Sequence, residues 1–177
     1  MSKTRIINNK TELNNLRQEI LESLDKNVAA LGKLMDSTDS LSFFKKIKFE
    51  KTVIDPLTGE LENFAEMIDQ CQTYLVTIMG AEYLIDKFPD TEFTIHLGNV
   101  SGYDIISKDE SIIAECFAST NYKNNNKLYN DLKELAENKT AVHKYEFFTD
   151  FKATPKVISN AKEKYPEIEI IKFEDTK

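Results

Sequence analysis

The sequence predicts an α/β fold of the α+β kind, with a central mixed β-sheet flanked by helices and a helical segment in front of it. Apolar residues recur at helical spacing up to about residue 88, and alternation with a period of two begins shortly afterwards. Three consecutive strand patterns then precede two helix and strand units, which gives about five strands in all. Such an order produces a sheet with both antiparallel and parallel neighbours.

Two long helices are predicted in the first half of the chain. The first covers 9–37, with Thr11 as N-cap and a break at 36–40, and its apolar stripe packs either on its own domain or on a partner helix. The second covers 60–88 and follows a Pro/Gly turn; its length and apolarity predict burial against a sheet, with Gly80 as a point of close packing. We divide the chain into an N-terminal helical segment, 1–55, and an α/β core, 56–177.

The second half alternates strands and helices. "TEFTIHLG" alternates apolar and polar residues, and "YDIIS" and "SIIAECFA" are two further strands joined by the polar turn "KDES". A helix opened by asparagines follows, and a proline near a first turn marks a later one. The elements expected after the three strands are a helix at 124–139, a strand at 144–149, a helix at 154–166 and a strand at 167–173.

Composition narrows the class of protein. Of the 177 residues, 41% are hydrophobic and 30% charged, which is ordinary for a globular protein. The two cysteines, Cys71 and Cys116, stand in apolar contexts and indicate neither a disulfide framework nor a zinc site. No apolar run reaches the length of a membrane span, and the start of the chain lacks the apolar core of a signal peptide. We therefore expect a cytoplasmic protein with no membrane partner.

Two acids interrupt the strands of the predicted hairpin. Asp104 stands near the start of one strand and Glu115 late in the next, each among apolar residues. Antiparallel strands about 5 Å apart would bring the two carboxylates together, and converging acids need a shared cation. Magnesium is commonly bound through one or two carboxylates and a substrate phosphate, and it supports phosphodiester hydrolysis. The alternative is that each acid faces solvent or pairs with a lysine.

The pattern "AEYLI", "GYDI" and "IIAECFAS", followed by a helix and strand unit, resembles the PD-(D/E)xK nuclease superfamily, to which restriction endonucleases belong. The resemblance covers roughly residues 60–172. It implies a restriction endonuclease-like core that uses Mg²⁺ or Mn²⁺ on double-stranded DNA. On this resemblance Asp104 and Glu115 are the metal-binding acids, Glu82 is the helix acid that some members add, and the backbone carbonyl of Cys116 completes the metal shell.

The sequence departs from that family at one position. The family lysine belongs two residues after the second acid, where this chain has Phe117. Some family members take the basic group from the following helix, which makes Lys127 the candidate and Lys123 the second choice. A helix N-terminus also favours a phosphate. The alternative for Lys127 is a solvated lysine paired with Asp131, four residues further along the chain.

Candidate nucleic-acid contacts form two groups. Lys123, Asn124 and Asn125 lie in a loop where asparagine could read base edges, although a capped turn explains the asparagines equally well. Lys45 and Lys46 belong to the basic stretch "KKIKFEK", which could contact phosphates or be a solvated face. The net charge of −7 confines any nucleic-acid surface to a local patch.

Three functions follow from these observations. The first is a Mg²⁺-dependent DNA endonuclease of the type II restriction kind, in which Asp104, Glu115 and Lys127 are catalytic. A single active site must pair to cut both strands, so this hypothesis implies a homodimer through the N-terminal helices. The second is a catalytically inactive nuclease-like module for DNA binding or protein assembly, which Phe117 and the acidic charge favour. The third is an unrelated sheet that supports a helical interaction surface.

Overall fold

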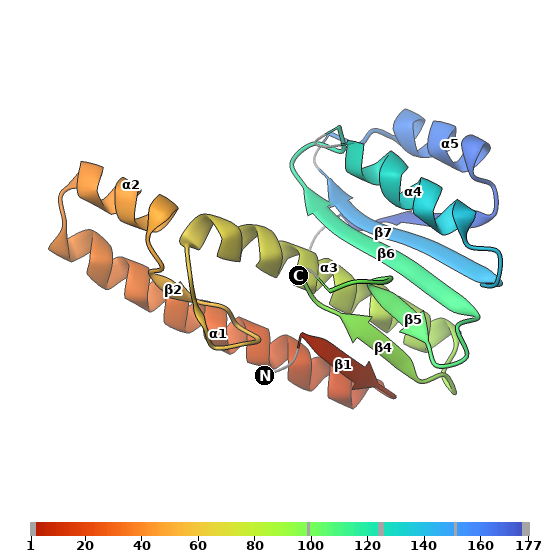
Figure 1. Ribbon diagram of the computed structural model, residues 1–177, viewed down its shortest axis with the longest axis horizontal. Coiled ribbons are helices and arrows are strands. Elements are labelled where there is room, and N and C mark those ends of the chain that lie inside the picture. The colour runs from red at the N-terminus through yellow and green to blue at the C-terminus, as the bar shows by residue number, and fades with distance from the viewer. Residues whose placement is uncertain (1–2, 99, 124–125, 151, 175–177) are drawn as a thin grey trace.

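The computed structural model describes residues 3–98, 100–123, 126–150 and 152–174. Its main sheet has six strands in the order β1-β4-β5-β6-β7-β8 (Figure 1). The strands from β1 to β6 pair antiparallel, whereas β6, β7 and β8 run parallel. The bounds are β1 (Thr4–Ile7), β4 (Phe93–His96), β5 (Ile105–Ser107), β6 (Ile112–Ser119), β7 (His143–Asp150) and β8 (Ile168–Lys172). The predicted mixed sheet is confirmed, with one strand more than expected.

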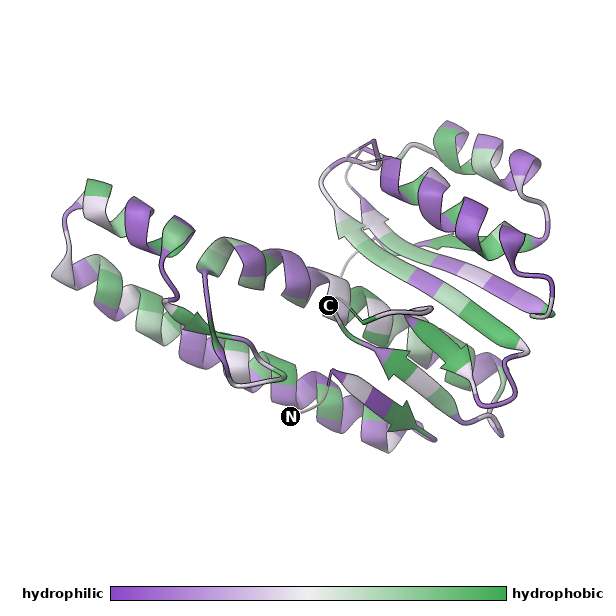
Figure 2. Ribbon diagram, in the orientation of Figure 1, coloured by the Kyte–Doolittle hydropathy of each residue, from purple (hydrophilic) through white to green (hydrophobic). Residues whose placement is uncertain are grey.

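Helices cover both faces of this sheet. The long helix α3 (Phe64–Lys87) packs on one face, while α4 (Lys127–Glu137) and α5 (Pro155–Lys164) pack on the other (Figure 1). Successive strand residues point to opposite faces, so β6 sends Ala114 and Cys116 towards α3 and Ile113 and Phe117 towards α4. Figure 2 shows that β6 is hydrophobic along most of its length, as a strand buried on both faces should be.

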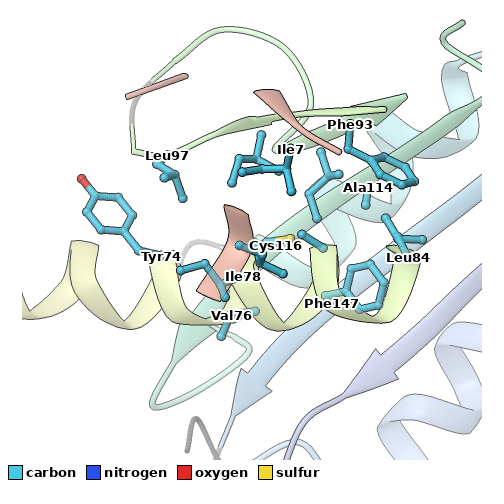
Figure 3. Packing of buried hydrophobic residues seen from close by; sticks show 14 of the residues in the cluster. Ile7, Tyr74, Val76, Ile78, Leu84, Phe93, Leu97, Ala114, Cys116 and Phe147 are labelled. Carbon is cyan, nitrogen blue, oxygen red and sulfur yellow. The ribbon is translucent and has the colours of Figure 1, made fainter. Parts of the chain in front are cut away.

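The core on the α3 side positions that helix closely against the sheet (Figure 3). A Cβ atom placed on Gly80 would lie 2.7 Å from Cδ2 of Phe147, a distance that real Cβ atoms essentially never show. Only glycine therefore allows α3 to approach β7 this closely, and the close packing expected at this residue is confirmed. Leu13, Leu16 and Ile20 of α1 (Lys10–Ser37) join the same core. The first part of the α1 stripe thus packs within its own chain.

The N-terminal segment contains elements that the sequence pattern does not predict. β1 is only four residues long, too short to show alternation, yet it forms the edge strand beside β4. α2 (Ser40–Phe49) carries apolar residues on both sides and so lacks a single stripe. A two-stranded hairpin, β2 (Val53–Ile54) and β3 (Leu61–Glu62), encloses the predicted Pro/Gly turn. Within the described residues, no helix combines the length and apolarity needed to cross a membrane.

The first helix has its N-cap two residues earlier than predicted. Its N-cap is Asn9 rather than Thr11, because the Asn9 side chain accepts a hydrogen bond from the N–H of Glu12 at 3.0 Å. A second asparagine, Asn63, caps α3 in the same way, through the N–H of Glu66. Both long helices therefore start where an amide side chain replaces the missing backbone partner.

Candidate active site

The two acids of the hairpin meet at its open end. Asp104 immediately precedes β5, and the pairing of Ile105 with Ala114 places it beside Glu115. The carboxyl groups of Asp104 and Glu115 share a hydrogen bond, and Oδ2 of Asp104 also accepts the N–H of Cys116 at 2.8 Å. Only 6% of Glu115 is exposed. The two acids therefore converge as expected, and the burial of Glu115 contradicts the alternative that each acid faces solvent.

Burial makes this pair difficult to ionise. It raises the pKa of Asp104 in spite of the hydrogen bond from Cys116. It raises the pKa of Glu115 to about 9, and the neighbouring charge of Asp104 adds to the shift. Two adjacent carboxyls in a low-dielectric site hold one proton between them at neutral pH. A cation could take the place of that proton.

Lys127, the first residue of α4, is brought to the same place. Its Nζ lies 2.7 Å from Oδ1 of Asp131, so the ion pair expected as the alternative is present. Burial would lower the pKa of Lys127, but the charges of Asp131, Glu115 and Asp104 outweigh it and raise the pKa overall. Asp104, Glu115 and Lys127 line one cavity of about 640 Å³. The structure therefore brings all three predicted catalytic residues together.

The walls of this cavity come from both sides of the sheet. The first half of α3 forms one wall, the loop before β5 another, and the end of β6 with the start of α4 the remainder. Besides the three residues named above, the lining residues are Asp69, Gln70, Thr73, Tyr74, Gly98, Val100, Gly102, Cys116, Phe117, Ala118, Ser119, Thr120 and Glu134. Hydroxyl, amide and carboxyl groups thus surround the paired acids.

Phe117 occupies a place in the core. It is 3% exposed and stacks on Phe148, with ring centroids 5.1 Å apart and planes 13° apart. It projects from β6 on the same face as Glu115, two residues away, as the family lysine would. An ammonium group at this position would lie in an apolar cluster beneath α4, where burial opposes its charge.

Glu82 does not join the acids. Nη2 of Arg17, on α1, donates to its Oε2 at 2.6 Å, and Glu82 is absent from the cavity lining. The lining residue of α3 nearest to it in sequence is Tyr74, more than two helical turns earlier. The prediction that Glu82 assists in metal binding is therefore corrected: its carboxylate pairs with α1. For Cys116 the prediction fits better, because N–H and C=O of a strand residue project to the same side, here towards Asp104.

The predicted nucleic-acid residues lie apart from one another. Lys123 is exposed and its Nζ stands 5.9 Å from the centre of the Tyr122 ring. Lys45 lines a groove between α2 and the start of α3, whereas Lys46 lies 3.8 Å from Glu50. Asn124 and Asn125 lie outside the described residues.

Two further acids stand behind the first pair: Asp131 was expected only as an ion-pair partner of Lys127, and Glu146 was not predicted. Glu146 of β7 is the register partner of Glu115, and Asp131 of α4 holds Lys127. Both are buried, and neither oxygen of Glu146 nor Oδ2 of Asp131 has a hydrogen-bond partner among the described residues. Burial raises the pKa of Asp131 to about 6, with only partial relief from Lys127. An acid inside the apolar strand "KYEFFT" was the available signal for Glu146.

The donor set of this cavity consists of oxygen atoms. Searched over the described ranges, the chain has no group of three or more His, Cys, Asp or Glu side chains that could hold a metal ion. Two carboxylates and a backbone carbonyl are nevertheless the kind of ligands that suit magnesium, which keeps several waters. Comparisons of the chain with protein-family models, with curated proteins and with solved structures found no match.

Proposed function

We propose that this protein is a Mg²⁺-dependent endonuclease of double-stranded DNA, of the type II restriction kind, with a restriction endonuclease-like core. One observation carries the proposal: Asp104 and Glu115 hydrogen-bond to each other in a cavity that Lys127 also lines. A buried pair of acids that holds one proton is unfavourable for the free protein. Binding of a divalent cation would offset that cost.

Each residue has a separate role in this proposal. Asp104 and Glu115 would hold the metal together with the carbonyl of Cys116, and their other contacts keep the carboxylates in place. When bound, Mg²⁺ lowers the pKa of its water and stabilises charge on a phosphodiester. Lys127 would donate to a phosphate oxygen from the N-terminal end of α4, where backbone N–H groups also favour an anion. Asp131 would orient the Lys127 ammonium group.

Cleavage assays with single variants test this proposal. The purified protein is incubated with supercoiled and linear DNA in Mg²⁺ or Mn²⁺, beside Asp104→Asn, Lys127→Ala and the control Glu137→Gln on the exposed side of α4. Asparagine retains an acceptor for the Cys116 N–H, so the first variant should fold. We expect metal-dependent cleavage by the wild type and the control, none by Asp104→Asn, and a loss of at least a hundredfold in Lys127→Ala, within the range of a positioned acid or base.

The inactive module remains the second candidate, because Phe117 fills the lysine position as a packed core residue. Intact DNA in every lane, together with measurable DNA binding, would favour this candidate over the nuclease. If Asp104→Asn still cleaves DNA, the cavity lined by Asp104, Glu115 and Lys127 is not the active site.

We also propose that the nuclease acts as a homodimer. Leu13 and Ile20 are internal, so the contact would have to use the exposed apolar side chains of the same helix, Leu21, Val28 and Met35. These three stand seven residues apart, and a two-fold axis at Val28 would place Leu21 of one copy opposite Met35 of the other. Light scattering of the full chain tests this idea: a monomeric mass at micromolar concentration would exclude it.

A further inference from the structure

The helix α2 presents an unusual outward face. None of its residues is buried, and Leu41, Phe44, Lys45, Lys48 and Phe49 are all exposed. These positions are three or four residues apart, so they share one side of the helix. Phe44 is 64% exposed and Phe49 78% exposed. Large aromatic side chains and ammonium groups therefore share a single face of α2.

That face borders a groove. The residues of α2 that line it are Phe44, Lys45, Ile47, Lys48 and Phe49. The first turn of α3 closes it with Phe64 and Ala65, around a volume of about 420 Å³. Five of its seven lining residues are apolar, and the other two are Lys45 and Lys48.

Charge distinguishes this segment from the rest of the chain. Residues 40–51 contain four lysines and one glutamate, a net charge of +3 (4 − 1) in a protein whose net charge is −7. Over the described residues, Lys46 is the lysine of α2 that has an ion-pair partner, Glu50 at 3.8 Å. Lys45 and Lys48 are thus available to an anionic partner.

We propose that this face of α2 binds unpaired nucleotides of a nucleic-acid strand. Exposed aromatic rings stack on bases, lysines beside them neutralise the phosphates, and this combination is typical of single-strand binding. A duplex buries the faces of its bases and would leave Phe44 and Phe49 without a partner. The positive charge of Lys45 and Lys48 favours a polyanion as the ligand. The rings of Phe44 and Phe49 favour a polyanion whose bases are accessible for stacking.

The groove and the acidic cavity lie along the same side of α3. Ala65 lines the groove, and Asp69 and Thr73 line the cavity, at intervals of four residues along one side of α3. Eight residues of helix span about 12 Å, the length of roughly four nucleotides stacked about 3.4 Å apart. An unpaired end of a DNA substrate bound on α2 could therefore extend to Asp104 and Glu115. This second step rests on the proposed nuclease function, whereas binding at α2 does not.

Fluorescence anisotropy with the full-length Asp104→Asn protein tests the inference. The probe is a fluorescein-labelled oligo(dT) of about 12 nucleotides, compared with a duplex of equal length. The variants are Phe44→Ala/Phe49→Ala and Lys45→Gln/Lys48→Gln. The matched controls, Val142→Ala and Lys133→Gln/Lys139→Gln, change exposed residues outside the α2 groove. Circular dichroism of each variant verifies folding, which is expected because α2 has no buried residue.

We expect the single strand to bind more tightly than the duplex. The double phenylalanine variant should lose at least tenfold in affinity, since stacking on one ring is worth roughly five- to 150-fold. The double lysine variant should bind more weakly and depend less on salt between about 50 and 200 mM. Unchanged affinity in both double variants would overturn the inference. So would equal loss for duplex and single strand, or binding of anionic vesicles or an acidic peptide in place of the oligonucleotide.

The two proposals can fail separately. Absence of cleavage in every protein, with oligonucleotide binding that is lost in the α2 variants, would refute the nuclease and leave this inference intact. Cleavage by the wild type and by all α2 variants, with unchanged oligonucleotide affinity, would refute the inference alone.

Discussion

The fully buried carboxyl of Glu146 makes the stability of this protein depend on pH. Glu146 is 0% exposed, and neither of its oxygens has a hydrogen-bond partner within the described part of the chain. Burial raises its pKa well above the ordinary value, and the charges of Asp131 and Glu115 add to this shift. The folded chain therefore holds a proton on Glu146 up to a higher pH than the unfolded chain does.

The sign and size of the effect follow from this difference. A carboxyl with a raised pKa in the folded state contributes its full stability below the unfolded pKa and loses it as pH rises. Each pH unit above the unfolded value costs about 1.36 kcal/mol. Between pH 5 and pH 7 the free energy of unfolding should therefore fall through Glu146, by at most about 2.7 kcal/mol for one group over two pH units. Glu146→Gln keeps the shape of the side chain and abolishes the titration.

Urea unfolding followed by circular dichroism at pH 5, 6 and 7 and constant ionic strength measures this contribution. The free energy of unfolding of Glu146→Gln, relative to that of wild type, should increase as pH rises, by at most about 2.7 kcal/mol over the two pH units. Glu137→Gln, an exposed position on α4, should keep the wild-type slope. If the difference in free energy of unfolding between wild type and Glu146→Gln is the same at pH 5, 6 and 7, Glu146 is ionised in the folded protein and the reasoning is refuted.

Substitutions in the packing give two further tests, each by urea unfolding. Gly80→Ala should destabilise by about 1–3 kcal/mol, because its Cβ would collide with Phe147. Gly32→Ala should stabilise by about 0.5–1 kcal/mol, because no heavy atom outside the local helix lies within 4 Å of its Cβ position. Equal effects of Gly80→Ala and Gly32→Ala on the free energy of unfolding would contradict the close contact between Gly80 and Phe147. Phe117→Ala should cost about 3–5 kcal/mol as a buried, stacked ring, and a change below 1 kcal/mol would show that this ring does not support α4.

The second half of the fold could be predicted because its signals are local. Each strand from β4 onwards alternates in polarity or forms a short apolar run between turn residues; loops join β4, β5 and β6, and one helix stands between each later pair of strands. The convergence of Asp104 and Glu115 followed from the same local information, since one hairpin carries both residues.

The rest depended on contacts that distant parts of the chain make. β1 pairs with β4 across some ninety residues, as Thr4 with His96, and four residues give no alternation to read. Glu82 was misplaced because α3 is buried on more than one side, so its sequence does not identify the side that faces the acids. Glu146 reaches the site through the parallel pairing of β7 with β6, a crossover partner that no hairpin rule supplies.

The two interpretations of Lys127 are compatible in this structure. Asp131 takes one hydrogen bond from Nζ at 2.7 Å, and an ammonium group has three N–H donors, so two remain for a phosphate or a water. The ion pair also fixes a side chain that is otherwise flexible, and it holds the charge near Glu115 in the same cavity. Phe117 packs in the core, so a lysine at its position would bury its charge in the apolar cluster. Lys127, at the start of α4, brings a positive charge to the cavity from outside that cluster.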